Sequence, residues 1–161
     1  MEFLAWLDHT AFAATLNQNV WVYPLVLTLH TIGMAIVVGI VMMISLRMFF
    51  GFPSQIPVLA LERLVPLAWV GFLINFISGS LLFTPEASTV SLKLMFQLKI
   101  LCIILGGIAL WFMLGRAFRP QMAGAQPISP AGRAWALATM VFWIAAIVSG
   151  RMIAYIKIKG L

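Results

Sequence analysis

Residues 20–46 read VWVYPLVLTLHTIGMAIVVGIVMMISL, and His30 is the only side chain in this run that titrates near neutral pH. A helix of this length extends for about 40 Å, whereas the hydrocarbon core of a bilayer is about 30 Å thick. The run therefore predicts a membrane-spanning helix that tilts or projects beyond the lipid.

The rest of the chain has the same character. Of its 161 residues, 63% are hydrophobic and only 9% are charged, and the mean hydropathy is +1.09. A soluble domain is roughly half apolar and a quarter charged, so this composition excludes an ordinary soluble protein. Apolar runs bounded by prolines or charges predict four spans, at about 20–48, 64–83, 93–115 and 132–156. They leave no room for a separate soluble catalytic domain, and we predict one membrane domain over 1–161, an all-α integral membrane four-helix bundle.

The first segment, about 2–16, differs from the spans because acidic side chains are mixed with its apolar ones. Phe3 and Trp6 stand beside Glu2 and Asp8, and no basic residue precedes them. A cleaved signal peptide would need a basic start. We therefore expect a short amphipathic helix that stays in the protein and lies in the membrane interface.

The net charge of +6 and the pI near 10.3 are best explained by membrane topology. Most Lys and Arg residues stand at or near span ends, so we expect contact with the bilayer and not with nucleic acid. The connections after the first and third spans hold five basic residues: Arg47, Arg63, Arg116, Arg119 and Arg133. Three stand at the other ends of the spans: Lys93, Lys157 and Lys159. The positive-inside rule then predicts cytoplasmic longer loops and both termini outside, which is periplasmic in a bacterial inner membrane.

Residues for common catalytic chemistry are few. The only histidines are His9 and His30, Asp8 is the only aspartate, and Cys102 is the only cysteine. A Ser-His-Asp set inside the membrane and a cysteine metal cluster are therefore both missing. We expect that the isolated chain is not an enzyme.

Five polar residues inside the spans fall at one depth, in the leaflet that holds the termini. Counting along each helix puts them about 9 to 16 Å from that end. Because polar groups are costly in lipid, we predict that they face one another in the bundle interior and bind a cofactor. They are His30, Asn75, Ser78, Lys99 and Arg151. Gln97, Glu86 and Tyr155 are predicted to line the mouth of this site.

Simpler explanations exist for each of these residues. Lys99 and Arg151 can extend their charged ends to the interface, and His30 can satisfy a neighbouring carbonyl. Asn75 and Ser78 can hydrogen-bond between helices. In the cofactor hypothesis, His30 is the metal ligand, and Met34 and Met152 are further candidate ligands of a soft metal or of haem iron.

Several stretches resemble a family of small bacterial four-helix inner-membrane proteins of unknown function. The resemblance covers nearly the whole chain and rests on HTIG, VPLAWVGF, SGSLLF, FQLKIL and SGRMIAY, at residues 30–33, 65–72, 78–83, 96–101 and 149–155. It implies an inner-membrane location and picks out His30, Lys99 and Arg151 as motif positions. This chain has Met113 where some members of the family carry a histidine. The end of the second span and the lysine of the third are more remotely similar to the copper-resistance protein D superfamily.

Three functions remain open from these patterns. The first is a redox-associated membrane subunit, in which His30, Lys99 and Arg151 hold haem b or a quinone. The second is a structural or accessory subunit that binds a lipid headgroup, other membrane subunits or further copies of itself, without a cofactor. The third is copper handling, although two cations beside His30 would repel a metal ion.

Overall fold

The computed structural model describes residues 2–10, 13–15, 19–51, 55–124 and 128–158, with the side chains of the last helix described as far as Tyr155. These residues form helices and turns and contain no β-strand. The helices are α1 (Glu2–Asp8), α3 (Val22–Phe50), α4 (Val58–Glu62), α5 (Val65–Phe83), the 3-10 helix η1 (Thr84–Glu86), α6 (Ala87–Val90), α7 (Leu94–Met113), the π-helix η2 (Leu114–Phe118), α8 (Arg119–Met122) and α9 (Pro130–Ile158).

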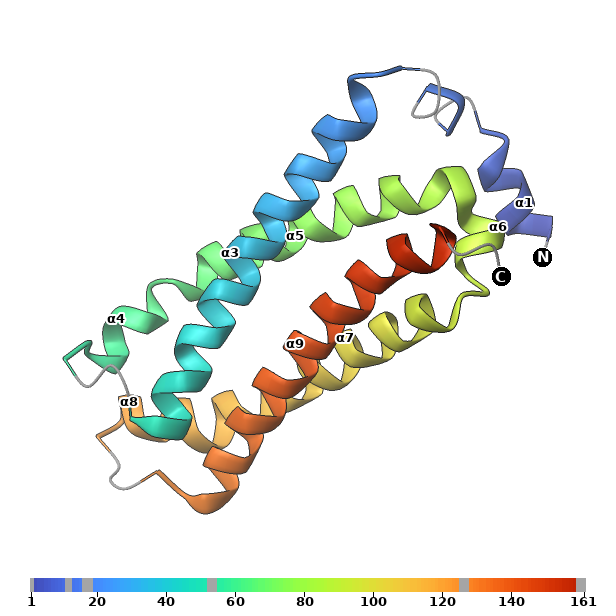
Figure 1. Ribbon diagram of the computed structural model, residues 1–161. Helices are drawn as coiled ribbons and strands as arrows, with labels where there is room; N and C mark the ends of the chain where they lie inside the picture. Colours follow the sequence, from blue (N-terminus) through green and yellow to red (C-terminus); the bar gives the residue numbers. More distant parts are fainter. Residues whose placement is uncertain (1, 11–12, 16–18, 52–54, 125–127, 159–161) are drawn as a thin grey trace.

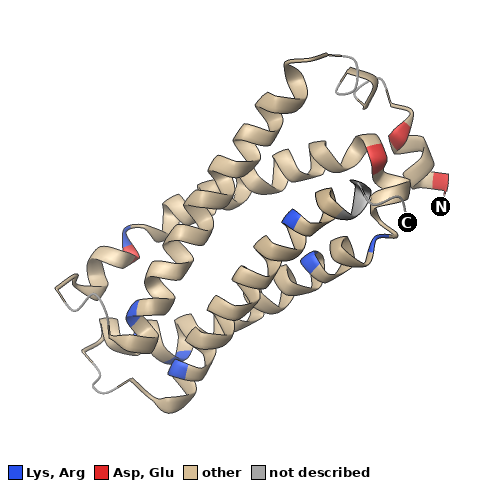
Figure 2. Cartoon of the chain, viewed as in Figure 1, with Lys and Arg blue, Asp and Glu red and all other residues tan. Residues whose placement is uncertain are grey.

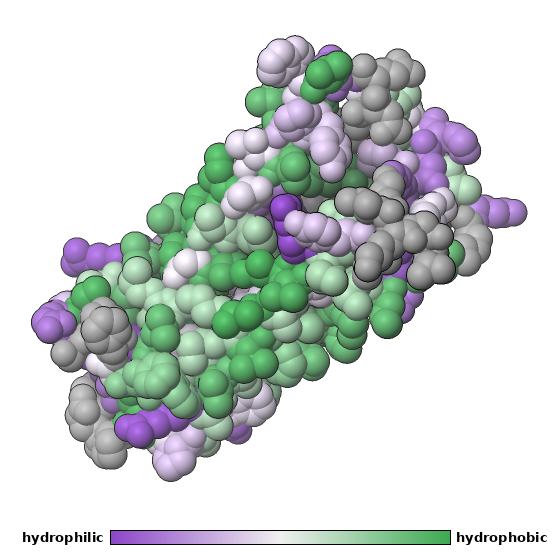
Figure 3. Space-filling view, viewed as in Figure 1, coloured by the Kyte–Doolittle hydropathy of each residue, from purple (hydrophilic) through white to green (hydrophobic). Residues whose placement is uncertain are grey.

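Four helical stretches within the described residues are long and apolar enough to cross a membrane: Val22–Phe50, Val58–Val90, Leu94–Met122 and Pro130–Tyr155. The predicted all-α fold class is confirmed, and the four spans make this a multi-pass membrane protein. Large apolar side chains point outward along the helices, as lipid contact requires. Trp111, for example, is 74% exposed. In Figure 3 hydrophobic residues cover most of the middle of the molecule, and hydrophilic residues gather toward its two ends.

The spans pair as two helical hairpins. Helix α5 packs along α3, and α9 packs along α7, while a smaller contact between α3 and α9 joins the hairpins (Figure 1). The N and C termini lie at one end of the elongated bundle, and α4 and α8 lie at the other. We call these the terminal end and the loop end. Acidic residues stand mainly at the terminal end, and the loop end carries a group of Lys and Arg residues (Figure 2).

The apolar core occupies the half of the bundle nearest the loop end. Its largest cluster brings together α3, α4, α7, η2 and α9 around the fully buried Met48 and Met113. Ser45 donates a hydrogen bond to the Met113 sulfur over 3.5 Å. Met113 is therefore a core residue at the opposite end from His30. A smaller cluster of Val37, Val41 and Trp143 closes the contact between the hairpins.

Close contact between α3 and α5 depends on two glycines that face each other. A Cβ atom on Gly33 would lie 2.8 Å from the backbone nitrogen of Asn75, and one on Gly71 would lie 2.7 Å from the Ile36 side chain. Small residues at one-turn spacing favour such contacts. Ala35 and Gly39 have the same spacing on α3, but Gly39 has open space beside it. The contact face of α3 runs through Gly33, and Gly39 points elsewhere.

The N-terminal helix is shorter than predicted and is attached to the bundle. Helix α1 ends at Asp8, residues 13–15 are again helical, and residue 16 lies outside the described residues. The helix packs against η1 and α6 in the connection between α5 and α7. The Asp8 carboxylate accepts hydrogen bonds from the Ser88 hydroxyl and from the Ser88 backbone N–H, the latter over 3.4 Å. The hydroxyl bond is the main reason why the pKa of Asp8 lies below its usual value.

Candidate binding site between the helical hairpins

The His30 ring lies on α5, about 12 Å along α3 from its first residue. The ring Nδ1 lies 3.1 Å from the Asn75 backbone oxygen and 3.2 Å from the Ser78 hydroxyl oxygen. The Asn75 side chain donates a hydrogen bond back to the His30 backbone oxygen over 3.3 Å. A Cβ on Gly79 would lie only 3.0 Å from the ring Cε1, so glycine makes room for the imidazole. The structure thus brings together the predicted residues His30, Asn75 and Ser78.

These hydrogen bonds determine the tautomer of a neutral His30. The Asn75 carbonyl can only accept a hydrogen bond, so Nδ1 must carry the proton that it shares with this oxygen. The Ser78 hydroxyl donates its own hydrogen to the Ile74 backbone oxygen over 2.6 Å, and therefore also acts as an acceptor toward Nδ1. The other ring nitrogen, Nε2, keeps a free lone pair. A histidine held in this way can ligate a metal or accept a proton through Nε2.

Lys99 of α7 reaches the same region from the other hairpin. Its side chain crosses Gly150 of α9, with Cδ, Cε and Nζ at 3.3, 3.4 and 3.6 Å from the position of a Cβ on that glycine. Lys99 is half-buried. No residue in the described part of the chain accepts a hydrogen bond from its ammonium group or forms an ion pair with it. The ammonium group can therefore donate to a ligand.

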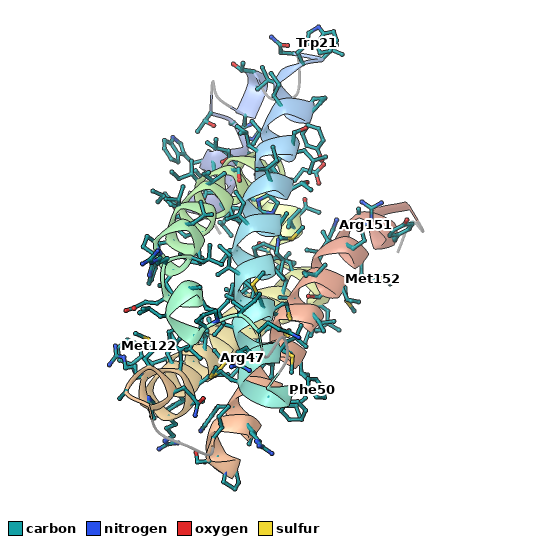
Figure 4. The ribbon with its side chains drawn as sticks, turned by 90° about the vertical axis from the view of Figure 1, so that its left-hand side faces the viewer. Trp21, Arg47, Phe50, Met122, Arg151 and Met152 are labelled. Carbon is teal, nitrogen blue, oxygen red and sulfur yellow. The ribbon has the colours of Figure 1, made fainter. Side chains whose placement is uncertain are left out.

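Arg151 does not join this group, contrary to the prediction that it faces the interior. Its side chain is exposed, and its guanidinium carbon lies 5.6 Å from the centre of the Tyr155 ring. In Figure 4, Arg151 lies toward the C-terminal end of α9, apart from α3. The preceding residue, Gly150, faces Lys99, and each helical step turns the next side chain by about 100°. Arg151 shares its depth with Lys99 but projects from another face.

The remaining predicted residues are also apart from His30. Met152 and Tyr155 are 41% and 53% exposed. Met34 is one turn beyond His30 on the same helix, so it cannot bind the opposite face of a haem held by His30. None of the interactions found among the described residues joins these three side chains to the imidazole. Their predicted roles as ligands remain predictions.

Two of the three predicted mouth residues, Gln97 and Glu86, lie in or near the connection between α5 and α7. Gln97 donates a hydrogen bond from its side chain to the Ser91 backbone oxygen over 3.2 Å, and Glu86 ends η1. A separate open hollow of about 460 Å³ is lined by Thr15, Asn19, Val20 and Trp21, at the start of α3. It lies more than a turn and a half of helix from His30 and is not part of the same site.

Two residues of the site were recognised from sequence only as packing positions. Gly79 and Gly150 belong to small-residue pairs at one-turn spacing, Asn75 with Gly79 and Ala146 with Gly150, which predict close helix packing. In the structure they make room for His30 and Lys99. Among the described residues no group of three or more His, Cys, Asp or Glu side chains could hold a metal ion. Any metal would therefore need His30 together with ligands of another kind.

No family model matches the chain, and no curated protein or solved structure shows significant similarity to it.

Proposed function

We propose that the protein is a redox-associated membrane subunit that binds a quinone between His30 and Lys99. The observation that carries the proposal is an imidazole on one hairpin whose Nδ1 is engaged, which leaves its Nε2 lone pair to a ligand, and a lysine ammonium on the other hairpin without a partner among the described residues. Each group comes from a different hairpin, so a ligand between them would contact both.

The two groups match the two oxidation states of such a ligand. A quinone carbonyl accepts hydrogen bonds, which the Lys99 ammonium can donate. A quinol hydroxyl donates a hydrogen bond, which Nε2 of His30 can accept. The proton of the quinol thus has an acceptor within the membrane, where such acceptors are few.

Haem b is the second candidate, and a specific observation favours it. A histidine that binds a metal through Nε2 commonly donates its other N–H to a backbone carbonyl, as His30 does to Asn75. Lys99 would then pair with a propionate. A second iron ligand would have to come from a methionine or from another subunit.

The proposed setting is the bacterial inner membrane, with both termini periplasmic. The basic residues near the loop end support this orientation. We further propose that the chain works with other membrane subunits or as a homo-oligomer. The resemblance to the small four-helix inner-membrane family fits this setting.

The test is cofactor retention by protein purified in a mild detergent. We expect extractable quinone, or a Soret band that shifts with dithionite, in the wild type and an about tenfold lower amount in His30→Ala. His9→Ala is the matched control, because His9 is exposed beside α1. Lys99→Leu should also lose the ligand, whereas Lys93→Leu should keep it.

Two outcomes would replace the proposal by another function. A wild type without chromophore or quinone, but with a stable oligomer by native mass measurement, would support an accessory subunit. Copper that is present in the wild type and lost in His30→Ala would support copper handling. Equal copper content in both would end the copper hypothesis.

A further inference from the structure

Arg151 and Tyr155 form an exposed cationic pair that the quinone site does not use. The guanidinium group lies over the aromatic ring, and both side chains are exposed near the end of α9, where Figure 4 labels Arg151. No carboxylate in the described part of the chain pairs with it. The guanidinium N–H groups of Arg151 therefore need a hydrogen-bond acceptor from a molecule other than the described part of the chain, because an unpaired charge near lipid is unfavourable.

The length of α9 places this pair at the level of the lipid headgroups. The candidate span Pro130–Tyr155 has 26 residues and extends for about 39 Å, which exceeds the hydrocarbon core by about 9 Å. With the excess shared between both ends, the last 4 to 5 Å lies among the headgroups. The Arg151 Cα is about 6 Å below that of Tyr155, so it lies near the hydrocarbon boundary. Its long side chain can reach the phosphate layer.

We infer that Arg151 and Tyr155 bind the phosphodiester of an anionic phospholipid in the leaflet that holds the termini. The planar guanidinium donates two parallel hydrogen bonds to phosphate oxygens. The Tyr155 ring holds the guanidinium in place, and tyrosine hydroxyls commonly face headgroups at this depth. Lys99, which crosses the neighbouring Gly150, adds positive potential that favours a headgroup with net negative charge.

The inference does not depend on the quinone proposal, because Arg151 and Tyr155 are exposed and their contact with a phosphodiester needs no redox ligand. A lysine at position 151 would supply the positive charge but not the two parallel hydrogen bonds of a guanidinium. Arg151→Lys is therefore the variant that best separates recognition of the phosphate geometry from simple charge attraction.

The experiment measures binding of phosphatidylglycerol to purified protein by native mass spectrometry, with phosphatidylcholine of the same acyl chains as reference. We expect tighter binding of phosphatidylglycerol to the wild type, an about tenfold loss in Arg151→Gln and a partial loss in Arg151→Lys. Tyr155→Leu should weaken binding in the same direction. Arg133→Gln is the matched control, because Arg133 is exposed on the same helix at its other end.

Three results would overturn the inference. Equal losses in Arg151→Gln and Arg133→Gln would mean general surface charge without a site. Equal binding of both lipids to the wild type would exclude recognition of the anionic headgroup. Thermal stabilisation by millimolar inorganic phosphate, lost in Arg151→Gln while phosphatidylglycerol has no effect, would identify free phosphate as the ligand.

Discussion

The two ends of the bundle are built differently, although the same four helices run through both. At the loop end, Met48 and Met113 pack with buried apolar side chains of α3, α4, η2 and α9 to form the core. At the terminal end, the contacts between helices include an imidazole, an amide, a hydroxyl and an ammonium. The comparison indicates that the loop end provides most of the packing, while the terminal end holds polar groups available to ligands.

Shortening a core methionine should have the largest effect on stability. Met48 is fully buried, and Met48→Ala leaves a cavity that we expect to destabilise the protein by about 2 kcal/mol, the lower end of the range for such changes. Met152→Ala, at the exposed position of the terminal end, should change stability little. Thermal unfolding in detergent measures both variants. Equal shifts in Tm would remove the distinction between the two ends.

A methyl group at the helix contact should have the next largest effect. In Gly33→Ala the new Cβ would approach the backbone of Asn75 to 2.8 Å, so we expect a loss of about 1 to 3 kcal/mol. Gly39→Ala is the control, because nothing lies within 4 Å of its Cβ position. Alanine has a higher helix propensity than glycine, so both substitutions stabilise α3 locally. Only the difference in stability between the two variants therefore reports on packing against α5. If the Tm of Gly33→Ala is no lower than that of Gly39→Ala, then α3 and α5 do not approach each other as closely at Gly33 as described.

Removing the Ser78 hydroxyl should have a smaller effect on the stability of the protein and a measurable effect on the amount of cofactor that it retains. Interhelical hydrogen bonds in membranes average about 0.6 kcal/mol, and Asn75 would still accept from His30 Nδ1 in Ser78→Ala. We therefore expect nearly unchanged stability and slightly weaker cofactor retention. Cofactor retention as low as in His30→Ala would instead show that the Ser78 hydroxyl is required to hold the His30 ring with its proton on Nδ1.

The attachment of α1 should respond to pH without affecting the spans. Because the pKa of Asp8 is lower in the folded protein than in the unfolded chain, its contribution to stability is complete above the unfolded value, near 3.9. It is lost as pH falls through the lower folded value. Hydrogen exchange of the α1 amides should therefore accelerate in strong acid, and Asp8→Asn should reduce this dependence on pH. A pH response of α1 that is identical in Asp8→Asn would assign it to another group.

The sequence predicted the spans well because length and hydropathy are properties of a single helix. Predicted limits such as 64–83 and 93–115 differ by at most two residues from α5 and α7, and the largest difference at the long helices is two residues. Depth along a helix also follows from counting residues, so the sequence alone was enough to predict that His30, Lys99 and Arg151 stand at a similar level. The direction of a side chain around the helix depends on which neighbour it meets. With little amphipathic contrast in these spans, the outward position of Arg151 could not be predicted.

The pairing of α3 with α5 and of α7 with α9 has a consequence for biosynthesis. Each hairpin joins helices that follow one another along the chain, so each can form as soon as its second helix enters the bilayer. The contact between α3 and α9 joins helices far apart in the sequence and can form only after α9 has been synthesised. His30 is on the first hairpin, whereas Lys99 and Gly150 are on the second. A chain truncated before α9 would thus insert the first hairpin with His30 in place, but it would lack Gly150 and the packing partner of α7 that positions Lys99.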